Sequence, residues 1–264
     1  MLLGVIADIH SNAVALEACL QALRDCDGLL LLGDYVSDTP WPAETMDRLY
    51  RLAEEKPCRF LRGNREDYML THAAGEGPDW PANSASGNLL FTYERLRKKD
   101  LEFFASLPIC FRVAEPGCEE IIACHGSPGS DRELLQPWGE NTRQWLERVD
   151  APLLLSAHTH HPAVLKHMGK TCVNPGSCGI AIDDPGHAQC AVLESAGGAW
   201  QATLLSVPYD LQRVVETIFT SGLYDMAPWF MNNNLHTLVR GIDKTPELVR
   251  LATALGGGEW PNIP

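Results

Sequence analysis

The chain has 264 residues, of which 45% are hydrophobic and 21% are charged, a composition that excludes a disordered or fibrous protein. Its 34 acidic and 21 basic residues give a net charge of −13. We therefore expect neither a long nucleic acid nor a membrane as partner, because both attract basic surfaces. The nine cysteines include no C-x-x-C pair. Because the sequence also has no signal-peptide pattern and no apolar run of membrane-spanning length, we expect a cytoplasmic protein.

The first half of the chain alternates short apolar runs with helical stretches. Polar turn residues follow each apolar run, as is typical of strands that are buried on both faces. We expect strands at 2–7, 29–32 and 58–61, separated by helices at 13–25 and 43–55. Strands that alternate with helices in this way predict βαβ units and a largely parallel sheet.

The second half of the chain has a different pattern, because few helices separate its later strands. After a loop at 73–88, we expect helices at 89–106 and 140–148 and strands at 109–114, 119–124, 152–157, 163–166, 171–173, 188–194 and 200–206. Strands that follow one another so closely favour a second, more antiparallel sheet.

The last segment of the chain begins after the final expected strand. It starts with a helical pattern and continues with an aromatic run at 224–230. We expect these aromatic residues to pack in the core or in a homo-oligomer interface rather than to bind substrate. The chain is therefore predicted to be one domain over 1–264, with a core at 1–208 and an appended helical segment at 209–264.

Potential metal ligands follow the expected strands directly. Ligand sites of open α/β sheets lie just beyond the carboxyl ends of the strands, so groups far apart in the sequence can meet at one edge. The set contains two carboxylates, one amide and four imidazoles, namely Asp8, His10, Asp34, Asn64, His125, His158 and His160.

Seven ligands are too many for one tetrahedral zinc ion. Their mixture of nitrogen and oxygen atoms suits two divalent metal ions. We expect manganese, with iron, zinc, cobalt or nickel as alternatives, and Asp34 is the natural bridging ligand. Two metal ions in one site clamp the oxygens of a phosphoryl group and activate a water molecule between them.

Each short motif also has a simpler interpretation. Asp8 and His10 could be helix-capping residues, and Gly33-Asp34 and Gly63-Asn64 could be ordinary turns. The three later histidines could be structural or could form a mononuclear zinc site. The joint occurrence of these groups at the strand ends favours a functional site.

The ordered motifs resemble those of the calcineurin-like metallophosphoesterase superfamily, in particular its small bacterial and archaeal branch. The resemblance covers about residues 1–205 and rests on five motifs in a fixed order: D-x-H at 8–10, G-D at 33–34, G-N at 63–64, H-G at 125–126 and H-x-H at 158–160. It implies a four-layer α/β/β/α sandwich with two mixed sheets flanked by helices.

The resemblance also implies a dinuclear phosphoesterase in which a metal-bridging hydroxide attacks phosphorus. One metal ion would be bound by Asp8, His10, Asp34 and His160, and the other by Asp34, Asn64, His125 and His158. Catalytic roles then fall to Asp34, Asn64 and Arg65, and substrate contacts to Asn64 and Arg65. The expected substrate is a small phosphomonoester, phosphodiester or nucleotide.

Arg65 departs from the family pattern, which has a histidine at the corresponding position of the third motif. Arginine does not donate a proton at working pH, but it can hold phosphate oxygens in a bidentate manner. We therefore expect a preference for esters with good leaving groups, such as aryl phosphates or anhydride-type nucleotides. The alternative is a non-catalytic binding or scaffold protein that keeps the fold, as a retromer subunit of this superfamily does.

Overall fold

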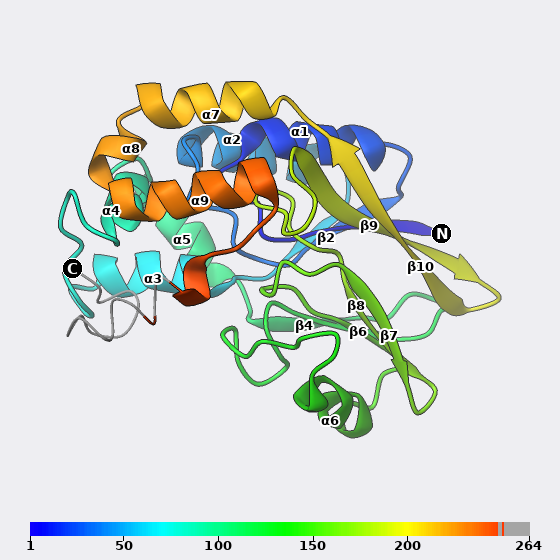
Figure 1. Ribbon diagram of the computed structural model, residues 1–264. Helices are drawn as coiled ribbons and strands as arrows, with labels where there is room; N and C mark the ends of the chain where they lie inside the picture. The colour runs from blue at the N-terminus through cyan, green and yellow to red at the C-terminus, as the bar shows by residue number, and fades with distance from the viewer. Residues whose placement is uncertain (248–249, 251–264) are drawn as a thin grey trace.

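The computed structural model describes residues 1–247 and 250. Two β-sheets lie face to face in the centre, and helices cover their outer faces (Figure 1). This is the predicted four-layer arrangement with two mixed sheets. Positions 248–249 and 251–264 of the predicted C-terminal segment lie outside the described residues.

The first sheet has the strand order β10-β9-β1-β2-β3. Strand β1 lies in its centre and runs parallel to β2 and antiparallel to β9. Four of the five residues of β1 are buried, because helices cover one face of the sheet and the second sheet covers the other. The strands are β1 (Leu2–Ile6), β2 (Gly28–Leu31), β3 (Cys58–Phe60), β9 (His187–Ala196) and β10 (Ala199–Pro208).

The second sheet has the strand order β4-β5-β6-β8-β7. Its inner strands β5, β6 and β8 are parallel, while the edge strands β4 and β7 are antiparallel to their neighbours. The strands are β4 (Cys110–Val113), β5 (Ile121–Cys124), β6 (Leu153–Leu155), β7 (Ala163–His167) and β8 (Lys170–Asn174).

The sheet membership of the late strands differs from the prediction. The hairpin of β9 and β10 joins the first sheet beside β1 rather than extending the second sheet. The first sheet is therefore mixed rather than largely parallel. The sequence shows which residues form a strand, but this pairing joins segments about 190 positions apart, and no local pattern encodes it.

Five helices follow strands of the first sheet along the chain, and two features of this region were not predicted. They are α1 (Ala13–Ala22), α2 (Pro42–Glu55), α3 (Asn64–Ala73), α4 (Gly87–Tyr93) and α5 (Lys98–Ser106). Helix α3 was missed, although Glu66 accepts a hydrogen bond from the backbone amide of Gly63 and so caps its start. The predicted helix at 89–106 is two helices, because Asp100 caps a new start by accepting a bond from the Arg97 amide.

Apolar side chains fill the space between the two sheets. Leu3 and Val5 of β1 point into this layer, where they cluster with Ile121 of β5, Leu153 of β6 and Val173 of β8. Ile6 instead belongs to the cluster under α1 and α2. Side chains that alternate between the faces of a strand thus join both layers of the core. On the outer side of the second sheet lies α6 (Glu140–Arg148).

Three helices follow β10 and lie on the same side of the molecule as α1 and α4 (Figure 1). They are α7 (Leu211–Thr220), α8 (Leu223–Met226) and α9 (Pro228–Arg240). Their apolar residues form a cluster that includes Val214, Ile218 and Phe230. Core packing, one of the two alternatives given for the aromatic run, is what the structure shows for Phe230. None of the helices in the described residues is long and apolar enough to cross a membrane.

Candidate metal centre

The residues that follow the strands adopt an unusual backbone conformation. Asp8, His10, Asp34, His158 and His160 all have positive φ angles, between 49° and 65°. Aspartate and histidine tolerate this left-handed region better than most residues, yet each such position costs about 1–3 kcal/mol. The conformation turns the side chains toward one centre, and the sequence motifs alone did not reveal it.

Hydrogen bonds between loops hold this backbone in place. The amide of Asp8 donates to the carbonyl of Gly33 at 3.1 Å, and the amide of His10 donates to the carbonyl of Asp34 at 2.9 Å. The first and second motifs are therefore fixed to each other by main-chain contacts. A glycine is required at position 33, where φ is 87° and a Cβ would overlap the backbone of Gly63.

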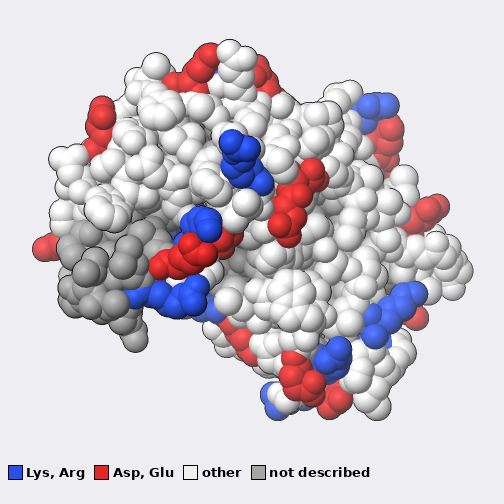
Figure 2. All heavy atoms as spheres, in the orientation of Figure 1, with Lys and Arg blue, Asp and Glu red and all other residues white. Residues whose placement is uncertain are grey.

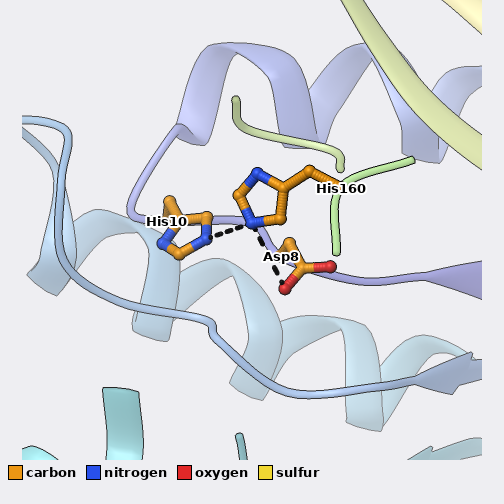
Figure 3. Close-up of side chains that lie close together, drawn as sticks. All are labelled: Asp8, His10 and His160. Atoms are coloured by element: carbon orange, nitrogen blue, oxygen red, sulfur yellow. Dashed lines mark hydrogen bonds and ion pairs between the residues drawn. The ribbon is translucent and has the colours of Figure 1, made fainter. Parts of the chain in front are cut away.

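Asp8, His10 and His160 form the first cluster of potential metal ligands (Figure 3). The Nε2 atoms of His10 and His160 are 3.0 Å apart, and the Nε2 atom of His160 lies 3.6 Å from Asp8 Oδ1. The ligand atoms of the three residues lie within 4.8 Å of one another. A backbone carbonyl, that of Ile180, lies 3.0 Å from His160 Nδ1 and orients the ring so that Nε2 faces the cluster.

Asp34, His125 and His158 form the second cluster. His125 Nε2 lies 3.4 Å from Asp34 Oδ1 and 3.1 Å from the side-chain oxygen of Asn64. The carbonyl of Leu32 lies 2.7 Å from His125 Nδ1 and fixes the orientation of that ring. Asn64 therefore joins this cluster at the start of α3.

Asp34 lies between the two clusters. Its Oδ1 atom faces His125 at 3.4 Å, and its Oδ2 atom faces His10 at 3.8 Å. The carboxylate is almost fully buried, at 2% exposure. One carboxylate thus offers one oxygen to each cluster, which is the arrangement expected of a bridging ligand.

The buried charges of the clusters shift one another strongly. Burial alone would lower the pKa of His125, but Asp34 and Asp8 outweigh it and raise the pKa of His125 to about 10. Burial raises the pKa of Asp34, but the nearby His125 and His10 outweigh this and hold it below its usual range. Burial and the neighbouring His125 lower the pKa of His158 to about 3. The two carboxylates therefore attract positive charge into the centre.

The donor set fits divalent metal ions. Asp8 Oδ1 is buried and has no hydrogen-bond partner among the described residues. Because an unpartnered buried oxygen destabilises the folded state, this atom is suited to bind a cation. The imidazole nitrogens of His10 and His160 face each other across 3.0 Å, a geometry that a shared cation would satisfy. Nitrogen and carboxylate ligands in this mixture suit manganese, iron, cobalt, nickel or zinc.

Arg65 lies beside the clusters and is held by a residue that sequence reasoning missed. Its Nη2 atom lies 2.8 Å from Asp38 Oδ2, and the same carboxylate oxygen lies 3.1 Å from His10 Nδ1. The other oxygen of Asp38 accepts a hydrogen bond from the side-chain amide of Asn88 at 2.6 Å. Asp38 is 1% exposed and belongs to a proline-containing loop that reads as an ordinary turn in the sequence.

Glu66 ties the second and third motifs together. Its carboxylate accepts hydrogen bonds from the backbone amides of Asp34, Tyr35 and Gly63, at 2.9, 2.8 and 2.8 Å. Burial and the nearby Asp34 raise the pKa of Glu66 to about 7. The residue is fully buried and lies outside both clusters, so it supports the metal centre without belonging to it.

The Asn174–Ser177 turn contacts the loops that carry the first cluster. The hydroxyl of Ser177 donates to the carbonyl of Asp8 at 2.9 Å, and Asn174 donates to Ala157 and Thr159 in the loop before His160. His161 lies toward the rim, where its ring meets that of Trp138 at 5.1 Å. The turn therefore positions residues of both motifs that supply the first cluster.

Comparison with known proteins identifies the family. The profile of the calcineurin-like phosphoesterases matches residues 1–162, a range that contains both clusters, Asn64 and Arg65. The chain belongs to the calcineurin-like phosphoesterase family. This family is metal-dependent, in agreement with the two groups of potential ligands.

Similar proteins extend the likeness beyond residue 162. An uncharacterized protein of Methanocaldococcus jannaschii is 25% identical over 241 residues, which cover 84% of this chain and 93% of the relative. A hypothetical protein of Pyrococcus horikoshii has a crystal structure that is 21% identical and matches with a TM-score of 0.77, covering 92% of this chain and 99% of its own. A metallophosphoesterase from Sphaerobacter thermophilus is 22% identical, with a TM-score of 0.70 and coverages of 89% and 100%. These two structures share the fold.

Proposed function

We propose that this calcineurin-like phosphoesterase hydrolyses small phosphoesters with two divalent metal ions, one at each cluster. The observation that carries the proposal is the position of Asp34, whose two oxygens face opposite clusters. Asp8, His10 and His160 would complete the first ion's shell, and Asn64, His125 and His158 the second. Manganese is the ion we expect first, because imidazole and carboxylate ligands occur together here.

The protein groups around the clusters would bind and orient the phosphate. When bound, two divalent ions supply Lewis acidity and lower the pKa of a water molecule toward neutrality. Arg65 presents Nε and Nη1, which are buried and without a hydrogen-bond partner among the described residues, and guanidinium groups of this kind bind phosphate oxygens tightly. Asp38 holds the guanidinium in place through the third nitrogen, Nη2.

The same arginine bears on which esters are hydrolysed well. Arg65 cannot protonate a departing alkoxide, since a guanidinium keeps its protons at working pH. Esters whose leaving group is stable as an anion, such as aryl phosphates and anhydride-type nucleotides, are therefore the preferred substrates in this proposal. On the face drawn in Figure 2, basic and acidic side chains lie intermixed rather than separated by sign, which favours a small substrate over a long nucleic acid.

Replacing Asp34 tests the proposal. We expect the wild-type chain, supplied with manganese, to hydrolyse an aryl phosphodiester or phosphomonoester and to hold two metal ions per chain by elemental analysis. Asp34→Asn should reduce turnover to background and lower the metal content, because it removes one charge and one oxygen ligand from the shared position. Asp225→Asn, an exposed aspartate of α8, serves as the control and should behave as wild type.

Two results would contradict the proposal. One is equal activity in the wild type and in Asp34→Asn. The other is a wild-type chain that binds no metal and hydrolyses none of the esters in a panel of mono- and diesters, which would favour the non-catalytic binding protein instead.

A further inference from the structure

A large cleft opens beside the two clusters. It has a volume of about 750 Å³, and its inner end is lined by Asn64, His158 and His160. Its other side is lined by Phe230, Asn233 and Thr237 of α9 and by Asp243 and Thr245 after this helix. Pockets of this size hold whole organic ligands, so the cleft has room for much more than the phosphate group that is transferred.

Besides Arg65, two further arginines line this cleft, Arg132 and Arg250. Arg132 lies in the loop between β5 and α6. Its guanidinium carbon is 4.8 Å from the centre of the Tyr68 ring. The guanidinium carbon of Arg65 lies 5.9 Å from the centre of the same ring. The guanidinium carbons of Arg65 and Arg132 therefore lie no more than about 11 Å apart. Contact with the Tyr68 ring orients the guanidinium of Arg132 but leaves its positive charge unneutralised.

The charge of Arg132 is poorly compensated by the protein. Its guanidinium donates no hydrogen bond within the described residues, and the nearest carboxylate, that of Asp131, approaches Nε only to 3.9 Å. The side chain of Arg132 is 53% exposed, so an anion can reach it from the cleft.

The remaining walls of the cleft are suited to an organic group. Ile180 and Phe230 are 6% and 5% exposed and, with Ile182, give one side an apolar character. Asn233 adds a buried side-chain oxygen that has no hydrogen-bond partner among the described residues. Apolar walls with a few placed polar atoms are typical of sites that bind small organic molecules.

We propose that this cleft binds the organic part of a phosphoester that carries a second anionic group, and that Arg132, held against Tyr68, binds that second anion. This inference rests on the proposed function for the place of the first phosphate, which lies at the clusters and Arg65. The second anion is a phosphate or a carboxylate, since a guanidinium binds both in the same bidentate manner. The substrate class is therefore an organic bisphosphate or a phosphorylated carboxylic acid.

Two matched pairs of ligands test the proposal and separate the two anions. Adenosine 3′,5′-bisphosphate is compared with adenosine 5′-monophosphate, and 3-phosphoglycerate with glycerol 3-phosphate. Binding is measured by calorimetry on the full chain, both metal-free and with manganese, and kcat/KM is measured wherever a ligand is hydrolysed. We expect the wild type to favour the doubly anionic member of at least one pair by about tenfold, the difference that one charged hydrogen-bonded contact provides.

The variants assign this preference to one residue. Arg132→Gln should remove most of the preference within the pair, and Arg132→Lys should restore part of it, because lysine keeps the charge but not the planar fork. Arg143→Gln is the matched control, since Arg143 is an exposed arginine of α6 that pairs with Glu140. Thermal unfolding of each variant verifies that it is folded.

Failure of this inference is distinguishable from failure of the proposed function. If the wild type hydrolyses phosphoesters but shows no preference in either pair, or if Arg132→Gln keeps the wild-type preference, the role of Arg132 is overturned while the phosphoesterase stands. If no ester is hydrolysed, aryl phosphates included, the proposed function fails. The binding ratios of wild type and Arg132→Gln then still decide whether Arg132 holds a second anion.

Discussion

The two sides of the cleft are built in different ways. On the side of the clusters, most ligands stand on loops that leave buried strands, and five of the seven have positive φ angles, with main-chain bonds from loop to loop. On the opposite side, α9 presents helical side chains and is held by the apolar cluster of α7, α8 and α9. The first side is determined by the backbone, and the second by the packing of side chains.

This difference suggests a division of roles. A substitution among the strand-end loops has to satisfy an unusual backbone as well as a ligand position, so few residues are acceptable there. Away from Asn234, which bonds to the backbone of Asp38, a substitution on α9 needs only to preserve helix packing, so the cleft can be reshaped without disturbing the clusters. We expect the loops to determine the chemistry and α9 to adjust which ester is accepted.

The largest effect is expected at the buried carboxylate that joins the loops. Glu66→Ala would leave three backbone amides, those of Asp34, Tyr35 and Gly63, without an acceptor. At about 1–3 kcal/mol for each unsatisfied buried group, the free energy of unfolding should fall by about 4 kcal/mol. Urea unfolding followed by circular dichroism measures it. Glu66→Gln keeps one acceptor oxygen and should lose less, so equal losses in the two variants would contradict this role.

A smaller effect is expected where the loops meet Arg65. Asp38→Asn removes the charge that faces both Arg65 and His10, and changes in such supporting residues lower metal affinity or activity by about 10–100-fold. Manganese titration and kcat/KM for an aryl phosphate measure the two quantities. Asp47→Asn is the control, because Asp47 is a half-exposed aspartate paired with Arg97. The prediction fails if both variants match the wild type.

The smallest effect is expected at the contact between the two sides. Asn234 of α9 donates to the backbone carbonyl of Asp38 at 2.5 Å. Asn234→Ala removes this buried bond, which is worth about 1 kcal/mol, and should lower the unfolding temperature by about 2–4 °C. Asn232 lies in the same helix and accepts an exposed bond from the hydroxyl of Tyr224 in α8, so Asn232→Ala should have less effect. If Asn232→Ala destabilises the chain as much, α9 is not anchored at Asp38.

Much of this arrangement was predictable from local sequence. The apolar runs predicted β1, β2 and β3 to within about two residues, because strands buried on both faces are almost continuously apolar. The seven potential ligands were predicted from their place after these runs and after the later runs that end before His125 and His158, and the structure brings them together. The family resemblance then supplied the four-layer arrangement.

The features that escaped prediction depend on contacts between distant segments. Asp38 stands in a turn-like loop, and only the folded chain brings it to Arg65 and His10. The pairing of β9 with β1 and the place of α9 beside the cleft likewise involve residues far apart in sequence. Helix α3 is an exception, since Glu66 three residues after Gly63 was a local signal for its start.

The pairing of β1 with β9 also bears on how the protein is made. Leu2 pairs with Glu194, and Asp8 is bonded through its carbonyl to Ser177 and Gly179. The N-terminal strand therefore leaves the ribosome long before the residues that complete its surroundings, and contacts of such long range form slowly. We expect the first cluster to be among the last parts to mature, because its surroundings are complete only after β9 has been synthesised.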